Sequence, residues 1–210
     1  MFIKVGDREY PFHRIRIELI ETGIQEQFRL FDKKTIRELL QHRRYEHLKE
    51  KVIKEYTELL DVPAGIAIYQ MKKNHDPFYK EFLNKYGDLT YCQFIVKGND
   101  SLLSKKGVYL VIKNDELVFA GICNNTFKLR FNQHIGNISP KSCFRDGTAT
   151  HCHINANIAE HIRDSTIYFQ ICSLTDLNEM KRLKNWIIDR FEPQWNLRFG
   201  SDVNYSYNNK

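Results

Sequence analysis

Arg130 and His134 are the first residues whose types and spacing suggest chemistry. A separation of four residues places both side chains on one face of a helix. A guanidinium in that position can bind a phosphate through two hydrogen bonds and can offset negative charge that develops on it. A histidine beside it can relay a proton or hold a neighbouring hydroxyl. The pair therefore indicates a site that handles phosphate groups.

Three short segments add further polar and aromatic side chains to this pair. Gly107–Tyr109 lies on one predicted strand, Phe119–Gly121 lies on the next, and Pro193–Asn196 follows the last predicted helix. Tyr109 projects to the opposite side of its strand from Val108, because successive side chains of a strand alternate between its two faces. The order of all these residues along the chain is more informative than any one of them.

Each residue also has an ordinary structural explanation. Tyr109 fits a core tyrosine with its hydroxyl at the rim, and Arg130 fits the surface of an amphipathic helix. A lone histidine such as His134 is more often structural than catalytic, and Asn196 fits a residue that caps a loop. Only their joint arrangement favours a catalytic domain.

Taken together, these segments resemble the catalytic domain of the GIY-YIG nucleases over residues 105–198. The resemblance implies a small α/β core, with a three-stranded antiparallel or mixed sheet flanked by helices. It implies hydrolysis of phosphodiester bonds in DNA with a divalent metal, magnesium (Mg²⁺) or manganese (Mn²⁺). It also implies that Tyr109 activates the attacking water, Arg130 stabilises the phosphate, His134 assists, and Asn196 is a structural or orienting group. A tyrosine in that role needs a depressed pKa, which a nearby cation can supply.

The chain departs from the family pattern at two positions. Phe119 stands where the family has a tyrosine, which preserves packing but loses a hydroxyl. Lys184, nine residues before Pro193, stands where the family has a metal-binding glutamate. A lysine has no acceptor and cannot bind a divalent cation, so metal binding at the Lys184 position is doubtful.

Helix periodicity argues against Glu179 as a substitute for the missing glutamate. Lys184 falls within the apolar stripe predicted for the last helix, where charged side chains are rare. Glu179 lies about 110° from the centre of that stripe, and it has the spacing of a capping box with Asp176. We interpret Lys184 as the mark of an inactive Glu→Lys variant of a nuclease; the competing hypothesis is a natural, non-catalytic DNA-binding protein.

The resemblance favours a site-specific endonuclease of a restriction system. In such members of the family, sequence recognition and dimer formation come from elements added around the catalytic core, and residues 1–100 suit that role. Cutting both strands of a duplex needs two active sites, so a homodimer is expected, at least on double-stranded DNA. A structure-specific repair nuclease or a homing nuclease is a further alternative, distinguished by its substrate.

Basic and polar residues outside the catalytic pattern are candidates for DNA contacts. They lie mainly in a predicted helix over 34–60 and a polar segment at 137–157. The candidates are Arg43, Arg44, Lys113, Lys141, Arg145 and Asn155. A solvated helix face and an ordinary polar loop also explain them. Zinc is an alternative at His151–His153 with Cys143, although this spacing matches no common closed zinc site.

Periodicity and turn residues predict the elements that position these groups. The N-terminal region, residues 1–100, is predicted to be mainly helical, with an initial hairpin; the core and C-terminal tail form residues 101–210. The predicted strands are 64–69, 91–97, 107–113, 117–122 and 166–172. The predicted helices are 34–60, about 74–86, one capped by Asn125 or Thr126 and ending near 135, and one that ends before Pro193. Residues 137–157 are predicted to be a polar loop.

The composition narrows the class of protein. The 32 basic residues exceed the 26 acidic ones, and a pI near 9.0 fits a polyanionic partner. No run approaches the roughly 20 apolar residues of a membrane helix, so no membrane partner is expected. The five cysteines are scattered, which is typical of free thiols in a reducing cytoplasm.

Overall fold

The computed structural model describes residues 1–197, which form two compact units. Unit 1 contains Met1–Leu19, Phe94–Asn132 and the described residues from His161 onward. Unit 2 contains Ile20–Gln93 and Gln133–Glu160. The boundary predicted near residue 100 therefore lies inside unit 1, and residues 1–100 contribute to both units.

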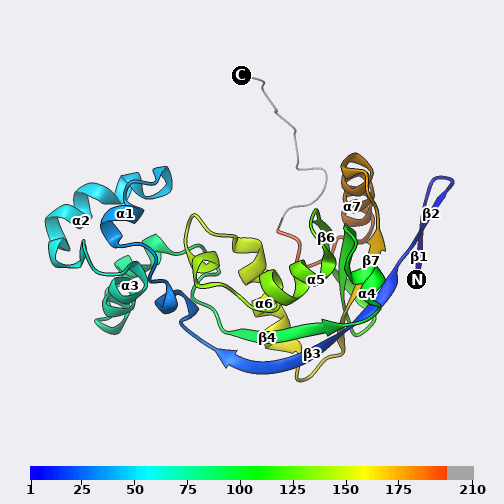
Figure 1. Ribbon diagram of the computed structural model, residues 1–210, viewed down its shortest axis with the longest axis horizontal. Coiled ribbons are helices and arrows are strands. Elements are labelled where there is room, and N and C mark those ends of the chain that lie inside the picture. The colour runs from blue at the N-terminus through cyan, green and yellow to red at the C-terminus, as the bar shows by residue number, and fades with distance from the viewer. Residues whose placement is uncertain (198–210) are drawn as a thin grey trace, which may run out of the picture. The chain divides into compact units, whose positions relative to one another are not determined.

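The main sheet has five strands in the order β4-β3-β7-β5-β6 (Figure 1). The strands are β3 (His13–Ile24), β4 (Tyr91–Lys97), β5 (Gly107–Lys113), β6 (Glu116–Cys123) and β7 (Ile167–Ser173). β5 pairs antiparallel with β6 and β7, and β7 pairs antiparallel with β3. The chain is α/β, but the predicted three-stranded sheet is too small. Sequence reasoning missed β3, although Arg14–Leu19 alternates polar and apolar residues as a strand does.

Two hairpins form where turn residues predicted them. Asn114 and Asp115 join β5 to β6 with φ values of 49° and 65°, which suits the two-residue turn that matches strand twist. β1 (Phe2–Val5) and β2 (Arg8–Pro11) form a separate two-stranded sheet. Both belong to unit 1.

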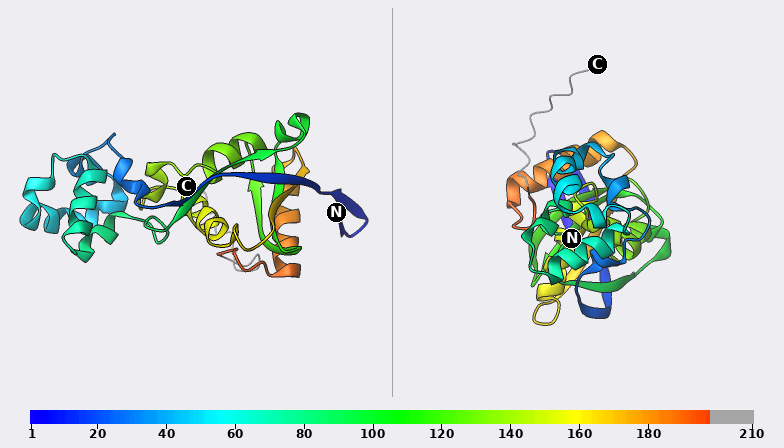
Figure 2. Two further views of the ribbon diagram at one scale, coloured as in Figure 1. Left: turned by 90° about the horizontal axis from the view of Figure 1, so that it is seen from below. Right: turned by 90° about the vertical axis from the view of Figure 1, so that its left-hand side faces the viewer.

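Helix α7 (Leu177–Phe191) covers one face of β5, β6 and β7 within unit 1 (Figures 1 and 2). The shared core contains Val108, Leu110, Ile112, Ala120, Tyr168, Cys172, Met180, Leu183, Ile187 and Ile188. Asp176 caps the helix by accepting a hydrogen bond from the Glu179 backbone N–H at 2.6 Å, as the sequence predicts. The helix ends before Pro193, also as predicted.

The opposite face of these strands is aromatic. Its rings come from Phe94, Tyr109, Phe119, Phe127, Phe131 and Phe169. Phe127 and Phe131 lie on α5 (Phe127–Leu129) and on the π-helix η5 (Arg130–Ile135) that continues it. Thr126 caps α5 by accepting from the Leu129 N–H, which confirms one of the two predicted caps. A short helix, α4 (Asp100–Leu103), precedes β5.

Unit 2 is helical and has its own core. Its helices are η1 (Gln27–Leu30), α1 (Ile36–Leu39), η2 (Arg43–Leu48), α2 (Lys49–Glu55), η3 (Thr57–Leu59), α3 (Ala64–Lys73), η4 (Pro77–Phe82), η6 (Pro140–Cys143) and most of α6 (Ala149–His161). The single helix predicted over 34–60 is four short ones, since Thr35 and His42 each cap a new helix start. The helix predicted around 74–86 is the 3-10 helix η4 alone. Among residues 1–197, no helix is long and apolar enough to cross a membrane.

Two other predictions in unit 2 are wrong. Residues 64–69 form the start of α3 rather than a strand, and Pro63 precedes this helix instead of ending one. The polar segment 137–157 contains η6 and most of α6 rather than a continuous loop. Its buried face includes polar residues such as His151 and Asn155, so it lacks the apolar stripe that marks a helix in sequence.

Candidate functional site

The ring of Tyr109 lies across Gly121, its partner in the register of β5 and β6. A Cβ atom at Gly121 would lie 2.6 Å from Cζ of Tyr109 and 2.7 Å from Cε1 of Phe119. Glycine is therefore required wherever the tyrosine ring takes this position. The first segment needs glycine too, because a Cβ at Gly107 would lie 2.0 Å from the Cys172 carbonyl oxygen.

Phe119 packs against Tyr109 as part of the aromatic face. Their ring centroids are 5.8 Å apart, and the Tyr109 ring lies 5.4 Å from Phe131 and 6.4 Å from Phe169. Tyr109, Phe119 and Phe169 lie on strands of the same sheet, so the Tyr109 side chain has little room to change rotamer. Phe119 thus fulfils the packing role expected of an aromatic residue at its position.

The environment of Tyr109 is opposite to that expected of a general base. Only 3% of the residue is exposed, and burial raises the pKa of its hydroxyl. The charge of Arg130 acts in the other direction but does not outweigh burial. The predicted depressed pKa is wrong, because the strand encloses the phenol in apolar rings. The raised pKa keeps the Tyr109 hydroxyl protonated at neutral pH.

Arg130 begins η5 and lies beside two residues of the sheet. Its charge lowers the pKa of Tyr109, and it also lowers that of Cys123, against the larger effect of burial in each case. Cys123 is the last residue of β6, and its thiol donates to the backbone oxygen of Asn125 at 3.1 Å. Sequence reasoning missed Cys123, although its register partner Gly107 was singled out.

His134 shares η5 with Arg130 but belongs to unit 2. The two residues lie within one turn of a π-helix, whose hydrogen bonds join residues five apart. In unit 2 the His134 ring stacks on His151, with centroids 5.3 Å apart and planes 19° from parallel. Sequence spacing predicted the common helix but not its π form, which widens the turn.

Asn196 holds the outer edge of β6. Its side-chain amide accepts from the Ala120 N–H and donates to the Ala120 carbonyl, both at 2.9 Å. The neighbouring Trp195 N–H donates to the Val118 carbonyl at 2.8 Å. Because Ala120 is the middle residue of Phe119–Gly121, Asn196 positions the strand that carries the site. This geometry fits the structural role expected of it.

Lys184 lies on α7, which packs against the face of the sheet opposite to the Tyr109 ring. It is half-buried, within a helix whose other core-facing residues are apolar. The neighbouring acid Glu179 is bonded to Arg8 and Tyr10. No three His, Cys, Asp or Glu side chains gather into a possible metal group within residues 1–197. The residues present therefore do not fit the divalent metal that the resemblance implies, and no chemical step is assigned to one.

The predicted DNA contacts of unit 2 are mostly engaged in its internal structure. Asn155 is fully buried, and its amide bonds to both backbone groups of Cys92 and to the Ile135 carbonyl. The prediction that Asn155 contacts DNA is therefore wrong. Lys141 is ion-paired with Asp146 and lies over aromatic rings.

The remaining candidates differ in how accessible they are. Arg145 is ion-paired with Glu81 at 2.8 Å, and Arg44 donates to the Arg145 carbonyl. Arg43 is exposed, and Lys113 lies half-buried at the end of β5. Arg43 and Arg44 thus have the exposed position that suits a DNA contact. Within residues 1–197, His151–His153 and Cys143 form no group of three possible metal ligands, which gives no support to a zinc site.

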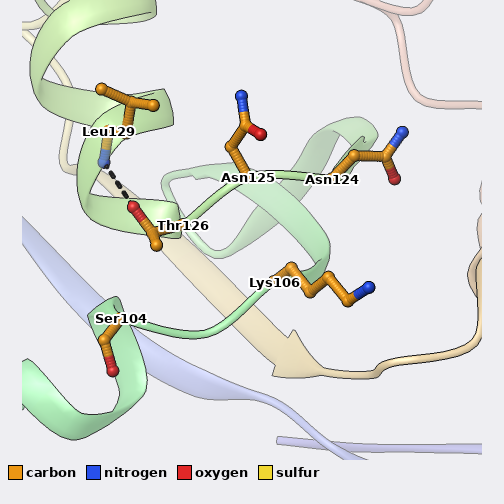
Figure 3. Close-up of a pocket in the computed structure, with 6 residues that line it drawn as sticks. All are labelled: Ser104, Lys106, Asn124, Asn125, Thr126 and Leu129. Carbon is orange, nitrogen blue, oxygen red and sulfur yellow. Dashed lines mark hydrogen bonds between the residues drawn. The ribbon is translucent and has the colours of Figure 1, made fainter.

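A hollow of about 350 Å³ lies where β5 begins and β6 ends (Figure 3). Its lining residues are Ser104, Lys106, Asn124, Asn125, Thr126 and Leu129. The pairing of Gly107 with Cys123 brings these two loops together. Sequence reasoning missed the hollow, because only that register places residues from the two loops side by side.

No protein-family model, no curated protein and no solved structure matches the chain.

Proposed function

We propose that the chain binds double-stranded DNA through a GIY-YIG-type nuclease site without hydrolysing the strand. One observation carries the proposal: the Tyr109 ring crosses Gly121 while Arg130 lies close enough for its charge to act on the Tyr109 hydroxyl, against the larger effect of burial. Three separate segments that resemble the nuclease family thus meet in unit 1. Their meeting supports a site for one phosphate of the DNA backbone.

Each residue has a role in this proposal that its surroundings suit. The Arg130 guanidinium binds the phosphate and offsets its charge. Tyr109, neutral at physiological pH, orients the bound group by donating a hydrogen bond. Asn196 fixes β6, so the Gly121 backbone over which the ring lies keeps its place.

A second candidate is a site-specific endonuclease, of the restriction type, that this chain carries in an inactive form. Lys184 favours it, because it is a charged residue on the core-facing side of α7 where the other residues are apolar. A functional carboxylate replaced by lysine accounts for a charge in that place. The two candidates differ in whether a carboxylate at residue 184 restores cutting.

The deciding experiment compares the unmodified chain with its Lys184→Glu and Lys181→Glu variants. Both substitutions lie on α7 and change the charge equally, so Lys181→Glu controls for charge alone. Plasmid cleavage is assayed with Mg²⁺ and with Mn²⁺, and duplex binding is measured in parallel at about 50 mM salt, where phosphate contacts are strong.

Discrete fragments from Lys184→Glu alone establish the inactive endonuclease. Binding by all three forms without cutting leaves DNA binding as the function. If no form binds duplex, the proposal is wrong. Cutting by the unmodified chain shows that Lys184 does not block hydrolysis.

A further inference from the structure

The hollow at the ends of β5 and β6 has the chemistry of an anion site. Its polar lining consists of one ammonium, two amides and two hydroxyls, and it contains no carboxylate. Figure 3 shows Lys106 on one loop and Asn124 and Asn125 on the other. Lysine, asparagine, serine and threonine are the side chains that commonly contact phosphate oxygens of DNA.

The backbone of both loops is held in place without any ligand. The Phe127 N–H donates to the Lys105 carbonyl at 2.8 Å, and the Leu174 N–H donates to the Lys106 carbonyl at 3.1 Å. On the second loop, the Cys123 thiol donates to the Asn125 carbonyl, and the Thr126 hydroxyl accepts from the Leu129 N–H (Figure 3). The site is therefore organised before anything binds, which lowers the entropic cost of binding.

The ammonium and the two amides of the hollow are accessible and unengaged within the described residues, whereas its two hydroxyls bond within their own loops. Lys106, Asn124 and Asn125 are exposed, and no hydrogen bond or ion pair between described residues holds their side-chain polar atoms. The nearby Lys128, in contrast, is ion-paired with Asp100 at 3.3 Å. An exposed, open hollow suits a chain that passes over it better than an enclosed small molecule.

We propose that this hollow binds a backbone phosphate of a DNA strand, next to the phosphate bound at Arg130. The inference rests on the proposed function and extends it. Asn124 directly follows Cys123, and Arg130 lies beside Cys123, so the two sites adjoin at the end of β6. Lys106 supplies the charge and Asn125 a neutral donor.

The test compares Lys106→Gln with Lys105→Gln. Both lysines are exposed neighbours, and each substitution removes one positive charge, but only Lys106 lines the hollow. Binding of a labelled duplex is followed by fluorescence anisotropy over a range of salt concentrations. We expect Lys106→Gln to weaken binding about three- to tenfold more than Lys105→Gln and to reduce the salt slope by about one.

A second pair of variants tests the hollow with an added negative charge. Asn125→Asp places a carboxylate in it, and Asn178→Asp places one on an exposed part of α7. Asn125→Asp is expected to weaken duplex binding more. Circular dichroism confirms that each variant is folded before binding is measured.

The outcomes separate this inference from the proposed function. Equal effects within both pairs overturn the inference while DNA binding stands. Absence of duplex binding by the unmodified chain overturns the proposed function, and this inference with it. Thermal unfolding in phosphate and in chloride of equal ionic strength tests for a free anion instead. Stabilisation by phosphate that Lys106→Gln abolishes, with duplex binding left unchanged by the same substitution, would assign the hollow to a free anion and contradict the assignment to DNA.

Discussion

At the scale of single residues, Tyr109 and Gly121 are coupled because the ring of one covers the α-carbon of the other. Gly121→Ala is expected to lower the free energy of unfolding by about 1–3 kcal/mol, since the added methyl forces enclosed rings to move. Chemical denaturation measures the change. In a Tyr109→Ala background the same substitution should cost less, because two of the three nearest atoms belong to Tyr109; an unchanged cost contradicts the coupling.

Asp146 makes the stability of unit 2 depend on pH. Burial acts to raise the pKa of its carboxyl, but hydrogen bonds from Lys141 and Tyr45 outweigh burial and hold the pKa below its usual range. A carboxyl with a lowered folded-state pKa stabilises the protein above its unfolded pKa of about 3.9. That contribution is lost as pH falls from there through the folded pKa.

The free energy of unfolding should therefore fall more steeply below about pH 4 in the unmodified chain than in Asp146→Asn. Urea denaturation at a series of pH values measures the two slopes. Asp32→Asn, at an exposed position of the same unit, is the matched control and should keep the slope of the unmodified chain. Equal slopes for Asp146→Asn and the unmodified chain would refute the role of this carboxyl.

The sequence predicted which residues of the site lie together, but it did not predict how deeply each one is buried. Tyr109, Phe119 and Arg130 meet because strand register and helix start follow from local patterns. The raised pKa of Tyr109 was not predictable, because it depends on rings such as Phe169 that come from distant strands. The DNA contact predicted for Asn155 failed for the same reason. A polar side chain is expected at the surface unless its buried hydrogen-bond partners are known.

At the scale of elements, Asn196 substitutes for a neighbouring strand at the edge of β6. Asn196→Ala removes both bonds to Ala120 and is expected to lower the free energy of unfolding by about 1–2 kcal/mol. Hydrogen exchange of the Ala120 amide should become faster. Asn196→Asp keeps the acceptor and loses the donor, so it should preserve protection of that amide; rapid exchange in Asn196→Asp would count against the arrangement.

Elements with strong local signals were predicted, and those that depend on distant partners were not. β5, β6, β7 and α7 carry apolar periodicity and turn or cap residues of their own. β3 is an exception, because Arg14–Leu19 alternates polar and apolar residues and sequence reasoning still missed it; its pairing with β7, far along the chain, was not predictable from that local pattern. The helix α6 buries polar residues whose partners lie elsewhere in unit 2, which hides its periodicity.

At the scale of the whole molecule, unit 1 depends on residues from the beginning of the chain. Ile3 and Phe12 belong to the core beneath α7, and His13–Arg16 pair with β7. A fragment of residues 101–210 is therefore expected not to fold cooperatively, although sequence reasoning assigned the core to that region. Circular dichroism with thermal unfolding of the purified fragment tests this. A sharp unfolding transition would show that the first strands are dispensable.

Unit 1 is built from segments far apart in the chain, and this sets the order in which the two units can be completed during translation. The ribosome releases His13–Arg16 early, but their partner β7 emerges only after every residue of unit 2. Unit 2 can thus form its core while the edge of β3 that pairs with β7 is still open to pairing with other nascent chains. The charged side chains of β3 are suited to prevent pairing of this edge with another chain. They include Arg14, Arg16 and Glu18.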